Sequence, residues 1–217
     1  MQGIERANVW ETVYRSLVEQ ITTGKLNPGE KLDEMEISTV LNVSRTPVRE
    51  ALKQLNAEGY ITTIPKKGSF VTKQSPKELD EIYGVLAKLE GLGVILAAGK
   101  LGENEVDELQ KLNLRMKRSW EENNYKKYLE DNVKFHLFFP KMAGNTVLES
   151  IINQLKKKTF RYHYFGITLG HIEEYIQDHE QILSALSMND FELASKSMEH
   201  HVDRIRKVLL GFSNSFQ

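Results

Sequence analysis

The stretch SRTPVREALKQL, residues 44–55, has the pattern of an amphipathic helix with a sharply defined start. Ser44 is the expected N-cap, because its hydroxyl can accept hydrogen bonds from the free N–H groups of the first turn. Pro47 falls within that turn, where its missing N–H costs no hydrogen bond. One face of the helix is apolar at the spacing i, i+3, i+4 and i+7, through Val48, Ala51, Leu52 and Leu55.

Two further helices are expected before this stretch. Residues 9–23 carry apolar side chains at helical spacing, and Gly24 ends that helix. Pro28 and Gly29 mark a turn. A short helix then follows over residues 33–41, and we expect it to bury Ile37, Val40 and Leu41.

A hairpin is expected after the stretch. Gly59 ends the helix, and the runs YITTIP and SFVTK favour two short β-strands. The residues between the runs, Lys66, Lys67 and Gly68, place positive charge at the tip of the hairpin. Three helices followed by such a hairpin predict a winged helix-turn-helix with a two-stranded wing.

Positive charge is concentrated around the quoted stretch. Residues 44–73 carry six Lys or Arg and two Asp or Glu, although the whole chain has a net charge of −1. A local basic face indicates an anionic partner, whereas a solvated helix face is the simpler alternative. A helix N-terminus favours phosphate, and an arginine fork can pair with guanine O6 and N7. The sequence therefore predicts binding of double-stranded DNA through Ser44, Arg45, Thr46, Arg49, Lys66, Lys67 and Gly68.

The rest of the chain has an almost purely helical pattern. Ser75 and Pro76 form a linker that turns into a new helix. The expected helices, separated by short breaks, cover residues 77–100, 103–120, 124–143, 145–164, 171–187 and 190–211. We therefore predict a mainly α protein of two domains. These are a winged helix-turn-helix over 1–74 and an all-α bundle of about six helices over 75–217.

Composition limits where the protein works. The chain has 217 residues and no cysteine, so it forms neither disulfides nor thiolate metal sites, in agreement with a reducing cytoplasm. No apolar run approaches the roughly 20 residues of a membrane span. The first residues lack the apolar core of a signal peptide. We expect a cytoplasmic protein without a membrane partner.

The histidines suggest a second kind of site. All six lie in the C-terminal part. Asn132 and His136 stand at i, i+4 on one expected helix, so both can point at one ion. His179 and His201 fall on apolar faces of two later helices. The face of His179 includes Ile172, Ile176 and Leu183, and that of His201 includes Leu193, Ser197, Ile205 and Val208.

Three inward histidines need a chemical explanation. An interior histidine is usually just hydrogen-bonded, but burying three imidazoles requires three partners or one cation. Three neutral imidazoles and an amide oxygen leave the charge of an ion intact and coordination positions open, which suits Zn, Ni or Mn and an exogenous oxygen ligand. The sequence therefore predicts a divalent metal site formed by Asn132, His136, His179 and His201.

The segment GKLNPGEKLDEMEISTVLNVSRTPVREALKQLNAEGYITTIPKKGSFV, residues 24–71, closely resembles the N-terminal domain of the GntR family of bacterial transcription regulators. The elements PG, VSRTPVREAL, EGY and G-x-F-V stand in order at the family spacing. The resemblance implies that Arg45, Thr46 and Arg49 contact operator bases, and that Lys67 and Gly68 are wing contacts. It also implies a homodimer on a palindromic operator, with a helical domain that senses a ligand and mediates dimerisation.

The helical part resembles, more loosely, the FadR-like subgroup with an FCD-type C-terminal domain. Metal-binding members of that subgroup typically use an Asp, a His four residues later, and one His in each of two later helices. His136, His179 and His201 match the histidine positions. Asn132 stands where Asp is usual, with Asp131 one residue out of phase. By the resemblance, either the Asn oxygen coordinates or the ion keeps three protein ligands.

The resemblance also bears on the effector. The subgroup usually carries an arginine four residues before the glutamate of an LE pair, thought to hold a carboxylate ligand. Leu86 stands there in this chain, with Lys88 as the nearest cation. An organic-acid effector bound to the metal is therefore an open interpretation. The run TFRYHYF adds Arg161 and His163, which either line the pocket with Lys88 or belong to an ordinary amphipathic helix end.

Three functions are compatible with these patterns. The first is a ligand-responsive transcription regulator, and the second is a constitutive DNA-binding protein whose metal only braces the bundle. The third is a metalloenzyme, since a metal with open positions can activate water. No H-E-x-x-H pattern is present, and the basic N-terminal part would have no role in such an enzyme. We therefore expect a regulator and not an enzyme, with repression or activation left open.

Overall fold

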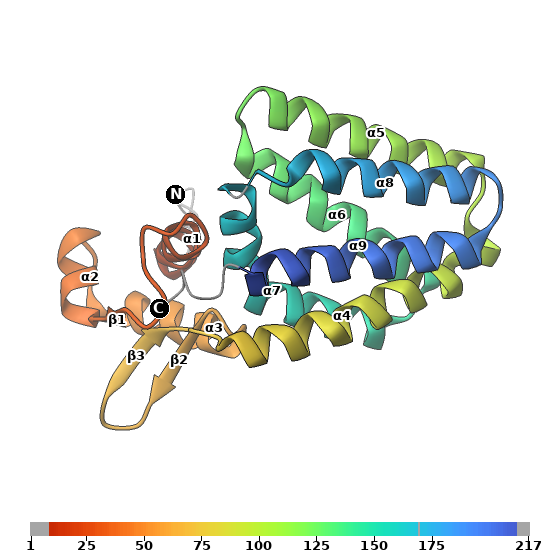
Figure 1. The fold of residues 1–217 in the computed structure, drawn as a ribbon. Coiled ribbons are helices and arrows are strands. Elements are labelled where there is room, and N and C mark those ends of the chain that lie inside the picture. Colours follow the sequence, from red (N-terminus) through yellow and green to blue (C-terminus); the bar gives the residue numbers. More distant parts are fainter. Residues whose placement is uncertain (1–8, 169, 212–217) are drawn as a thin grey trace, which may run out of the picture. The chain divides into compact units, whose positions relative to one another are not determined.

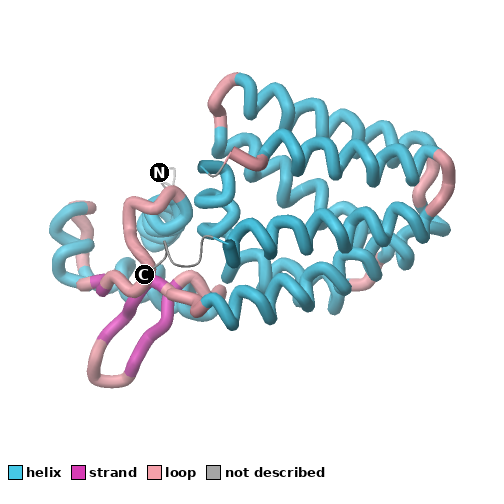
Figure 2. The backbone as a smooth tube through the Cα atoms, viewed as in Figure 1, coloured by secondary structure: helices cyan, strands magenta, loops and turns pink. Residues whose placement is uncertain are grey.

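The chain forms two units in the computed structural model (Figure 1), residues 1–73 and 74–217. Each unit has its own hydrophobic core. The structure describes residues 9–168 and 170–211, without the side chains of 160, 161 and 163–168. Helices dominate the described chain, and its strands lie in the first unit (Figure 2).

The first unit is built around the quoted helix. Its elements are α1 (Val9–Thr22), β1 (Lys31–Leu32), α2 (Glu34–Val40), α3 (Arg45–Ala57), β2 (Ile61–Ile64) and β3 (Gly68–Val71). The apolar stripe of α3 packs against α1 and is buried as expected from its spacing. The winged helix-turn-helix is thus confirmed.

The wing differs from the prediction by one strand. The antiparallel sheet has the order β1-β3-β2, with Lys31 and Thr62 both opposite Phe70. The two strands predicted for the wing are confirmed as β2 and β3, but the prediction missed β1, which also pairs with β3. A strand of two residues is too short to show a period-2 pattern, so periodicity could not predict it.

The structure corrects two local predictions in this unit, the capping bond of Ser44 and the burial of Val40. Ser44 does occupy the N-cap of α3, but its side chain makes no capping hydrogen bond. Val40 is 76% exposed instead of buried, since α2 has only seven residues and packs on α3 through other positions. The partly buried residues Ile37 and Leu41 make the contact with the core.

The second unit is an all-α bundle, as predicted. It consists of α4 (Pro76–Ala97), a short 3₁₀ turn (Ala98–Lys100), α5 (Glu103–Glu121), α6 (Tyr125–Ala143), α7 (Thr146–Thr168), α8 (Ile172–Ser187) and α9 (Phe191–Gly211). Helix α4 packs against α9, α6 and α7, and α8 packs against both α5 and α9 (Figure 1). Leu193 is 45% exposed, so the expected inward face of α9 was wrong at that residue.

Helix α4 is apolar on more than its buried face. Within the described chain, Pro76–Lys100 is the one helical segment long and apolar enough to cross a membrane, a weak signal that core helices also give. Its inner residues Leu79, Tyr83 and Leu86 are 1% exposed in the bundle core. Its outer face carries Val85, Leu92, Ile95 and Leu96, each more than 40% exposed.

The two serine caps give a prediction about stability. Ser75 forms a complete capping box with Glu78, whereas the Ser44 side chain makes no capping bond. We expect Ser75→Ala to lower the free energy of unfolding of the helical unit by about 1 kcal/mol, and Ser44→Ala to change stability by much less. Urea unfolding followed by circular dichroism measures both. Equal losses of stability in the two variants would contradict the conclusion that Ser75 caps its helix through its side chain and Ser44 does not.

Candidate metal centre and DNA-reading surface

Three histidines from three helices meet inside the bundle. His136 on α6, His179 on α8 and His201 on α9 are each at most 1% exposed. The centroids of their rings lie 5.4 Å apart for His136 and His179, 5.2 Å for His136 and His201, and 4.5 Å for His179 and His201. One ligand nitrogen from each lies within 4.8 Å of the others. The structure therefore brings the three predicted histidines together.

Each imidazole is held on its Nδ1 side by a different oxygen. His136 Nδ1 pairs with the carboxylate of Glu90. His179 Nδ1 lies 3.3 Å from Asn113 Oδ1, and His201 Nδ1 lies 3.4 Å from Asp178 Oδ2. These oxygens accept hydrogen bonds, which places the proton on Nδ1 and the lone pair on Nε2 of each ring.

The Nε2 atoms have no such partners. All three are buried and lack a hydrogen-bond partner among the residues that the structure describes. An unsatisfied buried polar atom is unfavourable, and three with lone pairs in one place are unusual. One cation would satisfy all three, while the oxygens behind Nδ1 fix the orientation of the rings. The residues present therefore fit a divalent metal ion.

The protonation states agree with this use. Burial lowers the pKa of His136 to about 4, although Glu90 acts in the opposite direction. Burial and the neighbouring His201 and His136 lower the pKa of His179 well below its ordinary value. Metal ligation requires neutral imidazoles, so these two rings are available as ligands at neutral pH.

The outer carboxylates each have their own cation. Burial disfavours the charge of Glu90, but His136 and Lys156 outweigh it and hold its pKa below the usual range. Lys156 Nζ lies 2.8 Å from Glu90 Oε1, and Lys156 is itself buried. Arg204 donates two hydrogen bonds to Asp178, of 2.8 and 3.1 Å. The protein charges around the three imidazoles thus balance pairwise.

The fourth predicted ligand is placed less fully. Asn132 is buried one turn before His136 on α6, and its side chain makes no hydrogen bond within the described chain. Its neighbour Asp131 is also buried, but its carboxylate pairs with three cations, Arg115, Lys127 and Lys134. Asp131 is therefore already neutralised elsewhere, which agrees with its position out of phase.

Of the predicted effector residues, Lys88 is the one whose side chain the structure describes. Lys88 is exposed on α4 and pairs with Glu199 of α9. The side chains of Arg161 and His163 lie outside the described residues. The structure does show one buried cation on the inner side of α4: Lys156, which contacts Glu90.

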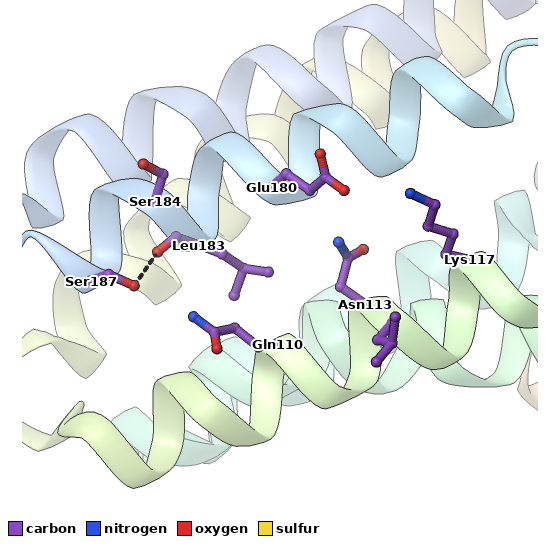
Figure 3. A pocket seen from close by; sticks show the side chains of 8 residues that line it. Gln110, Asn113, Lys117, Glu180, Leu183, Ser184 and Ser187 are labelled. Carbon is purple, nitrogen blue, oxygen red and sulfur yellow. Dashed lines mark hydrogen bonds between the residues drawn. The ribbon is translucent and has the colours of Figure 1, made fainter.

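A surface groove lies next to Asn113, the residue that contacts His179. The groove, of about 380 Å³, lies between α5 and α8 and is lined by two helix faces (Figure 3). Asn113 lies in its lining and contacts His179 through its side-chain oxygen. Lys117 and Glu180 also line it. The outer partner of one histidine is therefore also part of the surface groove.

The candidate DNA-binding residues gather in the first unit. Arg45 and Arg49 of α3 and Lys66, Lys67 and Gly68 of the wing line one concavity of about 550 Å³. Ser44 and Thr46 are exposed at the start of α3 but are not part of that lining. Gly68 has a φ of +110°, so a side chain there would be strained.

Several residues of the candidate metal centre were missed in the sequence. Helical periodicity indicates which face a residue occupies but not which residue on another helix it meets, so Asn113 carried no signal. Asp178 could have been noticed as the residue just before His179. Glu90 is the glutamate of the LE pair, which served only as a reference position. Both carboxylates turn out to hold ring nitrogens.

A winged helix-turn-helix joined to a helical bundle with a buried histidine triad defines a two-domain transcription regulator. Residues 10–71 match the model of the bacterial regulatory proteins of the gntR family, and residues 81–204 match that of the FCD domain. The chain belongs to the GntR family and carries an FCD domain, as the resemblance predicted.

Individual relatives agree with that placement. The chain is 28% identical over 183 residues to the HTH-type transcriptional regulator McbR of Escherichia coli K12, covering 83% of each chain. It is 29% identical over 199 residues to the repressor RspR of the same organism, covering 90% of this chain and 86% of the relative. The solved structure of McbR/YncC shows the same fold, with a TM-score of 0.74 at 24% identity over 95% of this chain and 97% of that one.

Proposed function

We propose that this GntR-family regulator binds a palindromic operator as a homodimer, and that its helical domain holds a divalent metal to which a small anionic effector binds. Three buried Nε2 atoms within reach of one ion carry the proposal. His136, His179 and His201 would hold the metal, with the amide oxygen of Asn132 as a fourth ligand. When bound, the ion supplies Lewis acidity and open coordination positions. Zn, Ni and Mn suit this donor set.

The charge balance supports an anionic effector. Lys156 offsets Glu90 and Arg204 offsets Asp178, so the neutral imidazoles leave the two positive charges of an ion uncompensated. A buried charge is stable only when it is paired. Asn132, in place of a carboxylate, adds no negative charge. An organic acid that chelates the metal would supply the missing charge, without the help of Lys88 on the surface.

The regulatory mechanism would be a shift between two states. Effector and metal in the helical domains favour one arrangement of the dimer, and so alter how well two DNA-binding domains match two half-sites. A screen of di- and tricarboxylic acids against operator binding, with and without metal, tests this step. The proposal of an effector fails if no acid changes operator affinity in the metal-loaded protein.

The relatives are regulators, and we propose a cytoplasmic protein without enzymatic activity.

The burial of the site favours a second candidate. Because the three histidines are at most 1% exposed, a metal that only braces the bundle is the alternative. In that case the protein binds DNA constitutively. Chelation would lower the melting temperature, and no small molecule would shift the affinity for DNA.

Metal content tests the histidine assignment. We expect about one ion per purified chain, since three protein ligands define one site. His179→Ala should lower the content because it removes a ligand nitrogen. Elemental analysis after dialysis measures the stoichiometry. His200→Ala is the matched control, since His200 is exposed on α9 beside His201. Unchanged metal in His179→Ala would exclude His179 from the site.

Base reading by Arg49 is tested by its removal. Arg49→Ala should weaken operator binding by about 1–3 kcal/mol and relax the preference at one base position, because a bidentate pair to guanine is lost. Binding to an operator and to its single-base variants measures both effects. Equal weakening on every sequence would make Arg49 a phosphate contact instead.

The outer face of α4 supports the homodimer. Val85, Leu89, Leu92 and Leu96 follow the spacing i, i+4, i+7 and i+11, which forms one stripe along the helix. A two-fold axis beside Glu90 and Gly91 would pair this stripe with itself, antiparallel. Val85 would face the partner's Leu96, and Leu89 the partner's Leu92.

Cross-linking tests this register. The chain has no cysteine, so introduced thiols alone can form disulfides. Val85→Cys with Leu96→Cys should give a covalent dimer on mild oxidation, seen on a non-reducing gel. Each single variant is a matched control, because its two copies of the thiol would lie about 16 Å apart. A dimer in solution without cross-linking would reject this interface, and a monomer would reject the homodimer.

A further inference from the structure

One acidic residue lies among the candidate DNA-reading arginines. Glu34 is the first residue of α2, directly after the capping residue Asp33. Its Oε2 accepts a hydrogen bond of 2.7 Å from Arg49 Nε and one of 3.3 Å from Arg45 Nη2. A single carboxylate oxygen of α2 thus holds two guanidinium groups of α3.

The geometry at Arg49 leaves its outer donors free to read a base. Glu34 contacts Arg49 through Nε, so the described contact leaves the two Nη groups unused. A planar guanidinium held at one edge has a fixed orientation, and the remaining N–H groups can still pair with guanine O6 and N7. Precise contacts need such support behind the contacting side chain.

The place of Glu34 gives its charge a second effect. It lines the same concavity as Arg45, Arg49 and the wing lysines. The hydrogen bond from Arg49 holds the pKa of Glu34 below its usual value, so the carboxylate is charged at neutral pH. A negative charge in a concavity that receives DNA repels phosphates and base acceptors unless the arginines screen it.

A role in folding alone does not explain the contact. The side chain of Glu34 is 31% exposed, and those of Arg45 and Arg49 are 55% and 56% exposed. Ion pairs with this much exposure add little to stability. The interaction therefore matters more for where the guanidinium groups point than for whether the domain folds.

We propose that Glu34 is a positioning residue that sets sequence specificity, because it orients Arg49 and Arg45 for base reading. It also weakens binding to DNA on which these two arginines contact phosphates instead of bases. This inference rests on the proposed base contacts of the two arginines. On a matching site, Arg49 keeps its bond to Glu34 while its Nη groups contact guanine. On a random site, the arginines turn to phosphates and leave the carboxylate unscreened near the DNA.

The test compares Glu34→Gln with the wild-type full chain. An operator is first selected from a random duplex library with the wild-type protein. Affinity for that operator and for a random duplex is then measured over a range of salt concentrations. We expect the specificity ratio to fall about 10-fold in Glu34→Gln, with tighter binding to random DNA. The affinity for random DNA should also depend more steeply on salt concentration, by the amount that about one additional phosphate contact produces.

Glu36→Gln is the matched control, because it removes the same charge from the same helix without a described contact to Arg45 or Arg49. It should keep the wild-type ratio. The inference is overturned if Glu34→Gln keeps the ratio within about twofold, or if Glu36→Gln lowers it equally. Thermal unfolding should be unchanged in both variants. Failure of Arg49→Ala to affect operator binding would instead reject base reading by Arg49, a separate result.

Discussion

The helical unit depends on how it accommodates three buried imidazoles. Each ring is anchored at Nδ1 by an oxygen from another part of the bundle, and each leaves Nε2 without a partner in the described chain. The anchors draw α4 and α5 into contact with the histidine helices α6, α8 and α9. A set of groups that is incomplete without a cation therefore lies where these helices meet, so their packing and the occupancy of the site are linked.

The two units solve opposite electrostatic problems. Inside the bundle the two carboxylates that contact histidine nitrogens, Glu90 and Asp178, are neutralised by Lys156 and Arg204. A positive ion at the histidines would therefore add to a balanced set of charges. On the DNA-reading surface, in contrast, arginines and lysines remain exposed, and Glu34 orients two of them without burying them. An ion pair is stronger where water is excluded than where it is exposed. This difference follows from the strength of electrostatic interactions in each environment.

Particular residues show what the sequence could and could not predict. Helical periodicity can be read from a single segment of sequence. It therefore predicted the apolar stripe of α3 and the inward faces of His136, His179 and His201. The contacts of Glu90, Asn113 and Glu34 depend on the packing of separate helices, which periodicity does not encode. Lys31–Leu32 pairs through its backbone and so left no side-chain pattern. Val40 shows that an apolar residue on a very short helix need not be buried.

Helix α4 joins two surfaces within one rigid rod. Glu90 faces inward and holds His136, while its neighbour Leu89, partly buried against the bundle core, belongs to the stripe proposed to meet a second subunit. Side chains at adjacent positions of a helix are about 100° apart, so a small rotation about the helix axis moves both at once. A change in the hold on His136 would then be felt on the outer face without any loop or hinge between them. In the proposed metal-bound dimer, α4 would contact the ligand shell of the ion on one face and the second subunit on another.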